Sequence, residues 1–166
     1  RLSSDNSIEG GASLAFGGDY KMFDEKKSRE IFEIKFANNF RFEKNNDLPK
    51  NNQIGEKTSN FFGEFSYNPN EYLSTNYNLS TRNNFTDVSY ENLNVEISLN
   101  NFVTTFDYLN ENNTADKNSY LTNTLKYSVD GSNSLSFSTR ENRELDMTEF
   151  CNLVYQYIVN DFHFVF

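Results

Sequence analysis

The sequence is poor in the residues that most often carry chemistry or cross-links. Its 166 residues include one cysteine (Cys151), one histidine (His163) and no tryptophan. A single cysteine excludes a disulfide framework and a cysteine-based zinc site within the chain. Cys151 and His163 also lack the partners that a nucleophile and a base would need. We therefore predict no catalytic residue, no metal site and no cofactor.

Glycine and proline are scarce as well, with seven and two residues, which excludes collagen-like and proline-rich chains. No apolar run approaches the ~20 residues of a membrane-spanning helix. The 15 basic residues are scattered among 24 acidic ones, for a net charge of −9, so we predict no nucleic-acid partner. The chain opens at Arg1 with no start methionine or signal peptide, and we expect it to be an internal part of a longer protein.

Asparagine and aromatic residues are abundant instead. The chain has 27 Asn, and its 17 Phe and 10 Tyr make 27 aromatic residues. Leu, Ile, Val and Phe together make up about a quarter of the sequence, too large a share for an intrinsically disordered chain. We therefore expect a folded domain that covers apolar surface.

Strict alternation of apolar and polar residues runs through most of the sequence. Between Glu30 and Glu43, for example, Phe32 and Ile34 alternate with Glu33 and Lys35. A period of two identifies a strand with one apolar and one polar face. The same pattern occurs in nine segments, at about 8–21, 30–43, 61–67, 73–80, 93–99, 102–108, 121–129, 134–140 and 153–157. The sequence thus predicts an all-β protein, an antiparallel up-and-down meander of about nine strands.

The connections between these segments alternate between short and long. Short turns are expected at Asn68–Asn70, Asn100–Asn101, Asp130–Gly131 and Asn160–Asp161, where residue types that tolerate tight turns gather. Longer polar connections are expected at 44–59, 82–86, 110–118 and 140–148. Short turns at one end and longer loops at the other are typical of a transmembrane β-barrel. Aromatic residues near strand ends would form its interfacial girdles, namely Tyr67, Tyr72, Phe102, Tyr108, Tyr120 and Tyr127.

The polar face carries charged residues within the strands. In a barrel these side chains would face a hydrated lumen, and the candidates are Glu33, Lys35, Arg41, Glu64, Arg82, Glu96, Asp107, Lys126 and Arg140. A soluble antiparallel sheet or sandwich remains an alternative, because its polar face would alternate in the same way.

Four stretches of the sequence resemble one family, in order and in spacing. They are Arg1-Leu2-Ser3-Ser4 with Ser7-Ile8-Glu9-Gly10-Gly11, then Lys57-Thr58-Ser59-Asn60-Phe61-Phe62-Gly63, Tyr67-Asn68-Pro69-Asn70-Glu71-Tyr72-Leu73 and Leu135-Ser136-Phe137-Ser138-Thr139-Arg140. They are similar to motifs of the lipopolysaccharide-assembly family LptD, also called OstA. Together they cover most of the chain, roughly from residue 1 to 160.

The resemblance implies that residues 1–166 form part of the C-terminal region of a large outer-membrane β-barrel. The implied function is transport of lipopolysaccharide to the outer leaflet of the cell outer membrane, without catalysis. The implied partners are lipopolysaccharide, outer-membrane lipid, an LptE-like plug lipoprotein in the lumen and the periplasmic Lpt bridge.

The end of the sequence departs from the family pattern. The family often has a cysteine just after a turn near its C-terminus, whereas Cys151 lies on a predicted strand, so no disulfide role is assigned to it. We also expect the closing strands of the barrel to lie outside these residues, in a chain truncated at both ends. Two alternatives stay open. One is a complete small outer-membrane barrel, porin-like or adhesin-like, because Phe162, Phe164 and Phe166 resemble a terminal assembly signal. The other is a soluble β-sheet surface-binding module.

Overall fold

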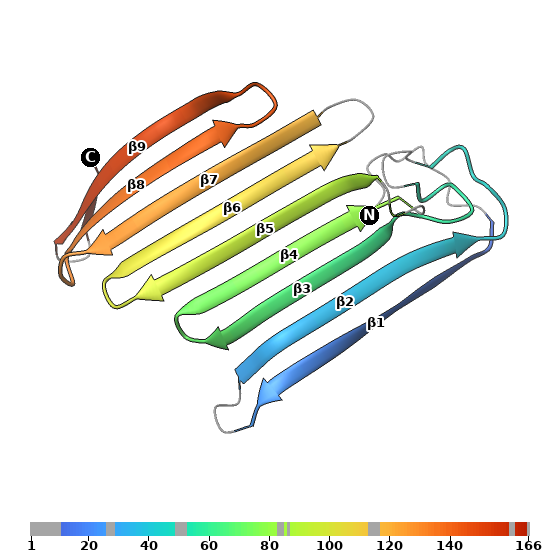
Figure 1. Ribbon diagram of the computed structural model, residues 1–166, viewed down its shortest axis with the longest axis horizontal. Coiled ribbons are helices and arrows are strands. Elements are labelled where there is room, and N and C mark those ends of the chain that lie inside the picture. Colours follow the sequence, from blue (N-terminus) through green and yellow to red (C-terminus); the bar gives the residue numbers. More distant parts are fainter. Residues whose placement is uncertain are drawn as a thin grey trace.

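The chain folds into one antiparallel sheet of ten strands, in the order β1 to β10 (Figure 1). The computed structural model describes residues 11–25, 29–48, 53–82, 85, 87–112, 117–159 and 162–165. The strands are β1 (Ser13–Asp24), β2 (Arg29–Arg41), β3 (Phe61–Asn70), β4 (Leu73–Thr81), β5 (Val88–Leu99), β6 (Phe102–Asn112), β7 (Lys117–Ser128), β8 (Asn133–Asn142), β9 (Met147–Val159) and β10 (Phe162–Val165). The predicted antiparallel meander is confirmed. Nine long strands match the nine alternating segments, and the short β10 adds a tenth.

The connections divide into a turn end and a loop end of the sheet. At the turn end, short connections join β1 to β2, β3 to β4, β5 to β6 and β7 to β8. At the loop end, the chain between Arg41 and Phe61 makes the longest connection and folds back onto β2. There the backbone N–H of Arg41 donates to the Lys57 carbonyl and that of Ser59 to the Asn39 carbonyl. The predicted separation holds for the connections between β2 and β3 and between β4 and β5. It is wrong for 110–118 and 140–148, because the strands run into both segments and leave connections no longer than the one between β7 and β8.

Asx turns explain part of the asparagine content. The side-chain oxygen of Asn70 accepts hydrogen bonds from the backbone N–H groups two and three residues later, at 2.9 and 3.0 Å. Asp130 and Asn142 do the same in their own turns. Such side chains replace backbone partners where the chain reverses. In the β5–β6 hairpin, Asn100 instead adopts a positive φ of 51°, which asparagine tolerates better than most residues.

The predicted turn positions are mostly confirmed. The turns at Asn100–Asn101 and Asp130–Gly131 lie between paired strands as expected. The turn predicted at Asn68–Asn70 is wrong, because Asn70 pairs with Leu73 and the reversal occurs at Glu71 and Tyr72. Pro69 stays within β3, where its carbonyl accepts a hydrogen bond from the Arg29 side chain at 2.6 Å. The turn predicted at Asn160–Asp161 lies outside the described residues.

The Asp130 turn gives a pH-dependent prediction. The N–H of Ser132, with the side chain and N–H of Asn133, holds the pKa of the Asp130 carboxyl below its ordinary value of 3.8. A depressed folded pKa stabilises the fold above the unfolded pKa, and this contribution is lost as the pH falls through the folded value. We expect Asp130→Ala to lower the urea midpoint of unfolding near neutral pH, and the difference from wild type to shrink at a pH of about 2.

The control for this prediction is Asp130→Asn, which keeps an oxygen acceptor but cannot titrate. It should retain most of the wild-type stability at neutral pH. Because position 130 no longer titrates, this site should not contribute to a change in the urea midpoint across the same acidic range. Equal losses for the alanine variant at neutral and acidic pH would contradict the account.

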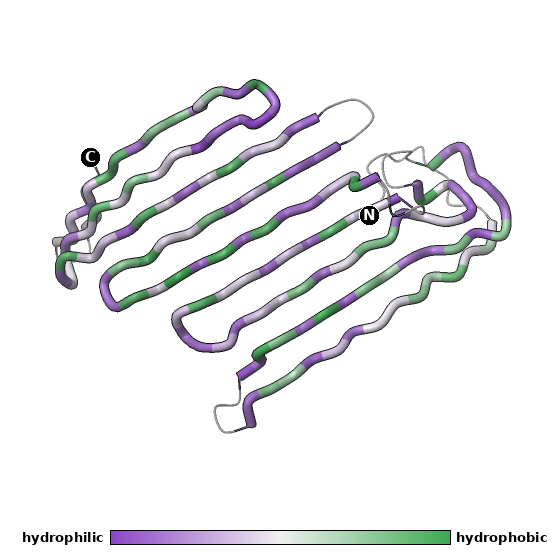
Figure 2. The backbone as a smooth tube through the Cα atoms, viewed as in Figure 1, coloured by the Kyte–Doolittle hydropathy of each residue, from purple (hydrophilic) through white to green (hydrophobic). Residues whose placement is uncertain are grey.

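The sheet has almost no buried apolar core. Leu48, in the long loop, is the one apolar side chain buried among the described residues, whereas the buried polar set includes Glu33, Arg41 and Asn60. Large apolar side chains on the strands are exposed, such as Phe16 (52 %) and Leu153 (65 %). Figure 2 shows the polar and apolar residues alternating along the strands of this single layer. A soluble sandwich would cover its apolar face with a second layer, so the structure does not favour that alternative.

Candidate functional site

Strand register sorts the side chains onto two faces. Directly paired residues lie on the same face of a sheet, and one such row joins Glu33, Ser66, Asn76, Asn94 and Asp107 across β2 to β6. We call the face that holds this row the polar face. The opposite, apolar face holds a second row, which joins Tyr20, Ile34, Phe65, Tyr77, Leu93, Tyr108 and Leu121.

A ladder of alternating charges crosses β1 to β3 on the polar face. Lys21 lies between Glu30 and Glu33, and Lys35 lies between Glu33 and Glu64, with nitrogen–oxygen distances of 2.5–3.1 Å. Glu33 is central, since its side chain is only 8 % exposed and contacts both lysines. The ladder therefore offers a polar surface in which most charges are already paired.

The polar face of β5 to β9 is held by amide and carboxylate contacts. The Asp107 carboxylate accepts hydrogen bonds from the side-chain amides of Asn92 and Asn94, at 3.4 and 3.3 Å. Farther along, the Arg140 guanidinium lies 3.9 Å from the centre of the Tyr120 ring and pairs with Glu149 at 3.2 Å. Because it stacks on Tyr120 and pairs with Glu149, the Arg140 side chain is held close to the polar face of the sheet.

Seven of the nine predicted lumen-facing residues lie within strands on the polar face. The register places them on β2, β3, β5, β6, β7 and β8, and they are Glu33, Lys35, Glu64, Glu96, Asp107, Lys126 and Arg140. Arg41 shares their parity, but it ends β2 and is 1 % exposed beside the long loop. Arg82 follows β4 and pairs with Asp87 at 3.7 Å. The structure therefore does not bring these two arginines together with the seven.

Sequence reasoning missed Lys21 as a member of the charge ladder. Its odd position in the first alternating segment was the available signal, because Asp19 and Lys21 share the polar parity of that segment. Its pairing with Glu33 depends on the β1–β2 register, which the sequence alone did not provide.

A hollow of about 860 Å³ opens on the polar face over β1 to β5. One cross-strand row runs through it, and the residues of this row are Gly17, Ala37, Phe62, Ser80 and Tyr90. The side chains of Gly17, Ala37 and Ser80 are too small to fill the space around the two rings. The size lies in the range of ligand pockets, about 300–1,000 Å³.

The apolar face forms a band that crosses the sheet obliquely. Val88 pairs with Thr81 beyond a register shift between β4 and β5 and is left out here. Within the regular pairing, the last large apolar residues toward the loop end on this face of β1 to β9 are Leu14, Phe40, Phe61, Leu79, Leu93, Tyr108, Leu121, Phe137 and Leu153. The cross-strand row that contains Leu93 on β5 contains Tyr20 on β1, and Tyr20 lies about six residues closer to the turn end than Leu14 does. From β1 to β5 this limit therefore moves toward the turn end. The row that contains Leu153 on β9 contains Ile97 on β5, and Ile97 lies about four residues closer to the turn end than Leu93 does. The limit thus moves in the same direction from β5 to β9.

The limit at the turn end shifts in the same direction. It is marked by Met22, Phe32, Tyr67, Leu73, Leu99, Phe102, Tyr127, Leu135 and Tyr157. The row that contains Met22 on β1 contains Val95 on β5, and Leu99 lies about four residues closer to the turn end than Val95 does. Averaged over both limits, the band moves by about one residue from each strand to the next. At ~3.4 Å per residue and ~4.8 Å per strand, the band is tilted by about 35° from the perpendicular to the strands.

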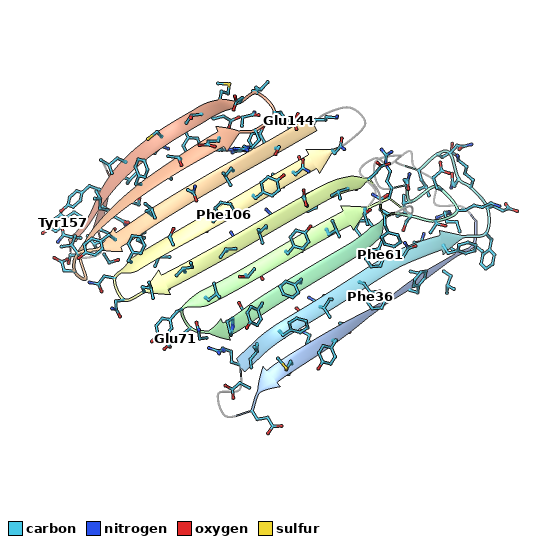
Figure 3. All side chains as sticks on the ribbon, in the orientation of Figure 1. Phe36, Phe61, Glu71, Phe106, Glu144 and Tyr157 are labelled. Carbon is cyan, nitrogen blue, oxygen red and sulfur yellow. The ribbon has the colours of Figure 1, made fainter. Side chains whose placement is uncertain are left out.

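Aromatic residues are frequent along the turn-end limit. Tyr67, Phe102 and Tyr127, which the sequence placed in a girdle, lie there on the apolar face. Tyr157 marks the same limit on β9, as Figure 3 shows near the turn end of the sheet. The prediction for Tyr120 is wrong, because this residue pairs with Leu109 and Asn142 on the polar face and stacks with Arg140.

Comparison with known proteins identifies the family. The model of the family "LPS transport system D" (LptD) matches residues 1–145, which contain β1 to β8. The chain belongs to the LptD family. The family match confirms the resemblance in the sequence motifs and indicates a role in lipopolysaccharide transport. No curated protein matches the chain.

Membership of the LptD family also bears on the chemistry of the chain. LptD proteins are outer-membrane transport and assembly proteins rather than enzymes. In the part of the chain that the structure describes, no cluster of three or more His, Cys, Asp or Glu residues could hold a metal ion. No helix among the described residues is long and apolar enough to cross a membrane. Cys151 is exposed, on the apolar face of β9 opposite Thr139.

Proposed function

We propose that this chain forms part of the wall of an outer-membrane β-barrel that delivers lipopolysaccharide to the outer leaflet. The oblique apolar band is the observation that carries this proposal. The band runs about 35° away from the perpendicular to the strands, so strands that cross a membrane with this band lying flat are tilted by about 35° from the membrane normal, close to the ~35–45° of membrane barrels. A soluble sheet gives no reason for both limits of its apolar face to shift together.

The height of the band supports the same proposal. It is tallest on β1 and β2, from Leu14 to Met22 and from Phe32 to Phe40, which at ~3.4 Å per residue and a tilt of about 35° spans roughly 22 Å along the membrane normal. On β4 to β7 it spans roughly 17 Å, and its limits lie closer still on β8 and β9. The apolar belt of outer-membrane barrels is about 25 Å tall. In this arrangement the apolar face contacts lipid, and the loop end and the turn end lie on opposite sides of the membrane.

The polar face then lines the lumen. The charge ladder, the asparagine-rich rows and the seven lumen-facing candidates give it a hydrated surface that sugars can pass without covalent chemistry. An LptE-like plug lipoprotein would occupy the lumen, and the periplasmic Lpt bridge would supply the lipid. The two sheet edges, β1 and β10, each pair with one strand among the described residues, so further strands would have to close the barrel. Residues 1–166 would accordingly be a partial barrel domain.

Depletion of the full protein from its source cells tests this function. Newly made lipopolysaccharide should stop reaching the cell surface and should accumulate inside the envelope, because the barrel provides the last step of delivery. Re-expression of the wild-type protein should restore surface lipopolysaccharide, measured by surface labelling. Unchanged delivery after depletion would overturn the proposal.

A further inference from the structure

We propose that the hollow on the polar face of β1 to β5 is a saccharide-binding subsite, which takes a neutral, hydroxyl-rich sugar ring. The inference rests on the proposed function, because it assumes that the polar face meets the sugar portion of the transported lipid. The inference goes beyond the proposed function because it assigns that contact to one site, the hollow over β1 to β5.

Two of the three aromatic residues that line the hollow, Phe62 and Tyr90, lie on the polar face, and we call the space between them the slot. Phe62 on β3 and Tyr90 on β5 occupy the same cross-strand row, with Ser80 of β4 between them. Strands two apart are about 9.6 Å from each other, so the small Ser80 side chain leaves room for one ring between the two aromatic groups. Aromatic faces suit the C–H-rich faces of a sugar, and the Tyr90 hydroxyl adds a polar group.

The base of the slot is a fixed set of hydrogen-bonding groups. The Asn60 side-chain amide donates to the hydroxyl oxygens of Ser80 and Ser89, at 3.0 and 2.9 Å, and the Ser89 hydroxyl lies 2.9 Å from the Ser80 carbonyl. Asn60 is 1 % exposed, and its Oδ1 has no hydrogen-bond partner among the described residues. A buried acceptor without a donor is costly, and a sugar hydroxyl supplies that donor only when the side chains that cover Asn60 move apart.

The charges around the hollow disfavour an anionic ligand. Its charged lining residues are Asp19, Lys35 and Glu64, and Lys35 is already paired with Glu33 at 2.9 Å and with Glu64 at 3.1 Å. A phosphate would find one neutralised cation and two carboxylates. Neutral hydroxyl groups can instead donate to the carboxylates, so the site favours the sugar rings over the phosphate groups of a lipopolysaccharide.

The absence of tryptophan from the sequence permits a direct binding experiment. The full chain carrying Phe62→Trp is titrated in detergent micelles with lipopolysaccharide from which the acyl chains have been removed. We expect a saturable change in its fluorescence, which an excess of inorganic phosphate does not reverse. Phe106→Trp, on the apolar face, provides the matched reporter and should not respond.

Matched substitutions locate the binding. Ala37→Leu fills the hollow and should weaken binding about tenfold or more. Ala15→Leu makes the same change one row away on the polar face, outside the lining residues, and should leave the affinity unchanged. The affinities of the Ala37→Leu and Ala15→Leu proteins are also measured by calorimetry with the native Phe62 in place. If Ala37→Leu prevents folding, Tyr90→Ala serves as the second variant of the hollow.

Two results would overturn the saccharide subsite. One is equal affinity in the Ala37→Leu and Ala15→Leu proteins, and the other is displacement of the oligosaccharide by phosphate. Absence of any binding to the wild-type chain would also reject the subsite. None of these results alters the depletion experiment, in which surface lipopolysaccharide reports on the proposed function independently.

Discussion

Phe106→Arg should strongly destabilise the protein in a lipid bilayer. Phe106 lies near the middle of the band on β6, which runs from Phe102 to Tyr108, and Figure 3 shows it in the central part of the sheet. A charge at the midplane of the lipid face of a barrel costs ~2–4 kcal/mol. We expect the variant to show a correspondingly smaller protease-protected fraction when it is folded into phospholipid vesicles.

Thr105→Arg is the matched control for this substitution. Thr105 is the adjacent residue and pairs with Glu96 on the polar face, where an arginine stays hydrated. The control should fold into vesicles nearly as well as wild type. If both variants lost the same amount of protected protein, or if Thr105→Arg lost more, the assignment of the two faces would be wrong.

Gly17→Ala should disrupt the pairing of β1 with β2. A β-carbon at Gly17 would lie 2.4 Å from the Phe36 carbonyl oxygen and 3.2 Å from the Ala37 α-carbon. Backbone atoms cannot move aside as a side chain can, so the two strands must separate locally. Overpacking of this kind typically costs ~1–3 kcal/mol, and it should appear as faster hydrogen exchange at the amides of β1.

Gly131→Ala is the control for the glycine substitution. Nothing lies within 4 Å of the β-carbon that it would add in the β7–β8 turn, so hydrogen exchange in β1 should stay unchanged. Equal protection of β1 in the Gly17→Ala and wild-type proteins would show that β1 and β2 are not as closely paired as the structure has them.

The sequence predicts the strands well because a period of two carries both their location and their two faces. Phe32, Ile34 and Phe36 alternate with charged or small residues, and all three lie on the apolar face of β2. The Asn100–Asn101 hairpin was predictable for a similar reason, since the turn is local and its residue types are specific. The family resemblance in separate short motifs extended these predictions to a role in transport.

Features that depend on cross-strand register could not be predicted from alternation. The hollow requires Gly17, Ala37 and Phe62 to meet from three strands, and a shift of one residue would turn Phe62 to the other face. The burial of Arg41 depends on how the long loop folds back onto β2. The girdle prediction for Tyr120 failed because residue type and nearness to a strand end do not determine the face, and an aromatic residue there can lie on the polar face.

Site-directed spin labelling along β6 tests the central claim most directly, because it reports lipid and water contact at each residue. Single cysteines at positions 102 to 109, in a Cys151→Ser background, would carry the label in the full chain in vesicles. Labels on Phe102, Thr104, Phe106 and Tyr108 should be accessible to oxygen, and those on Val103, Thr105, Asp107 and Leu109 to a water-soluble nickel complex. Accessibility without this two-residue period, or with the opposite phase, would contradict the account.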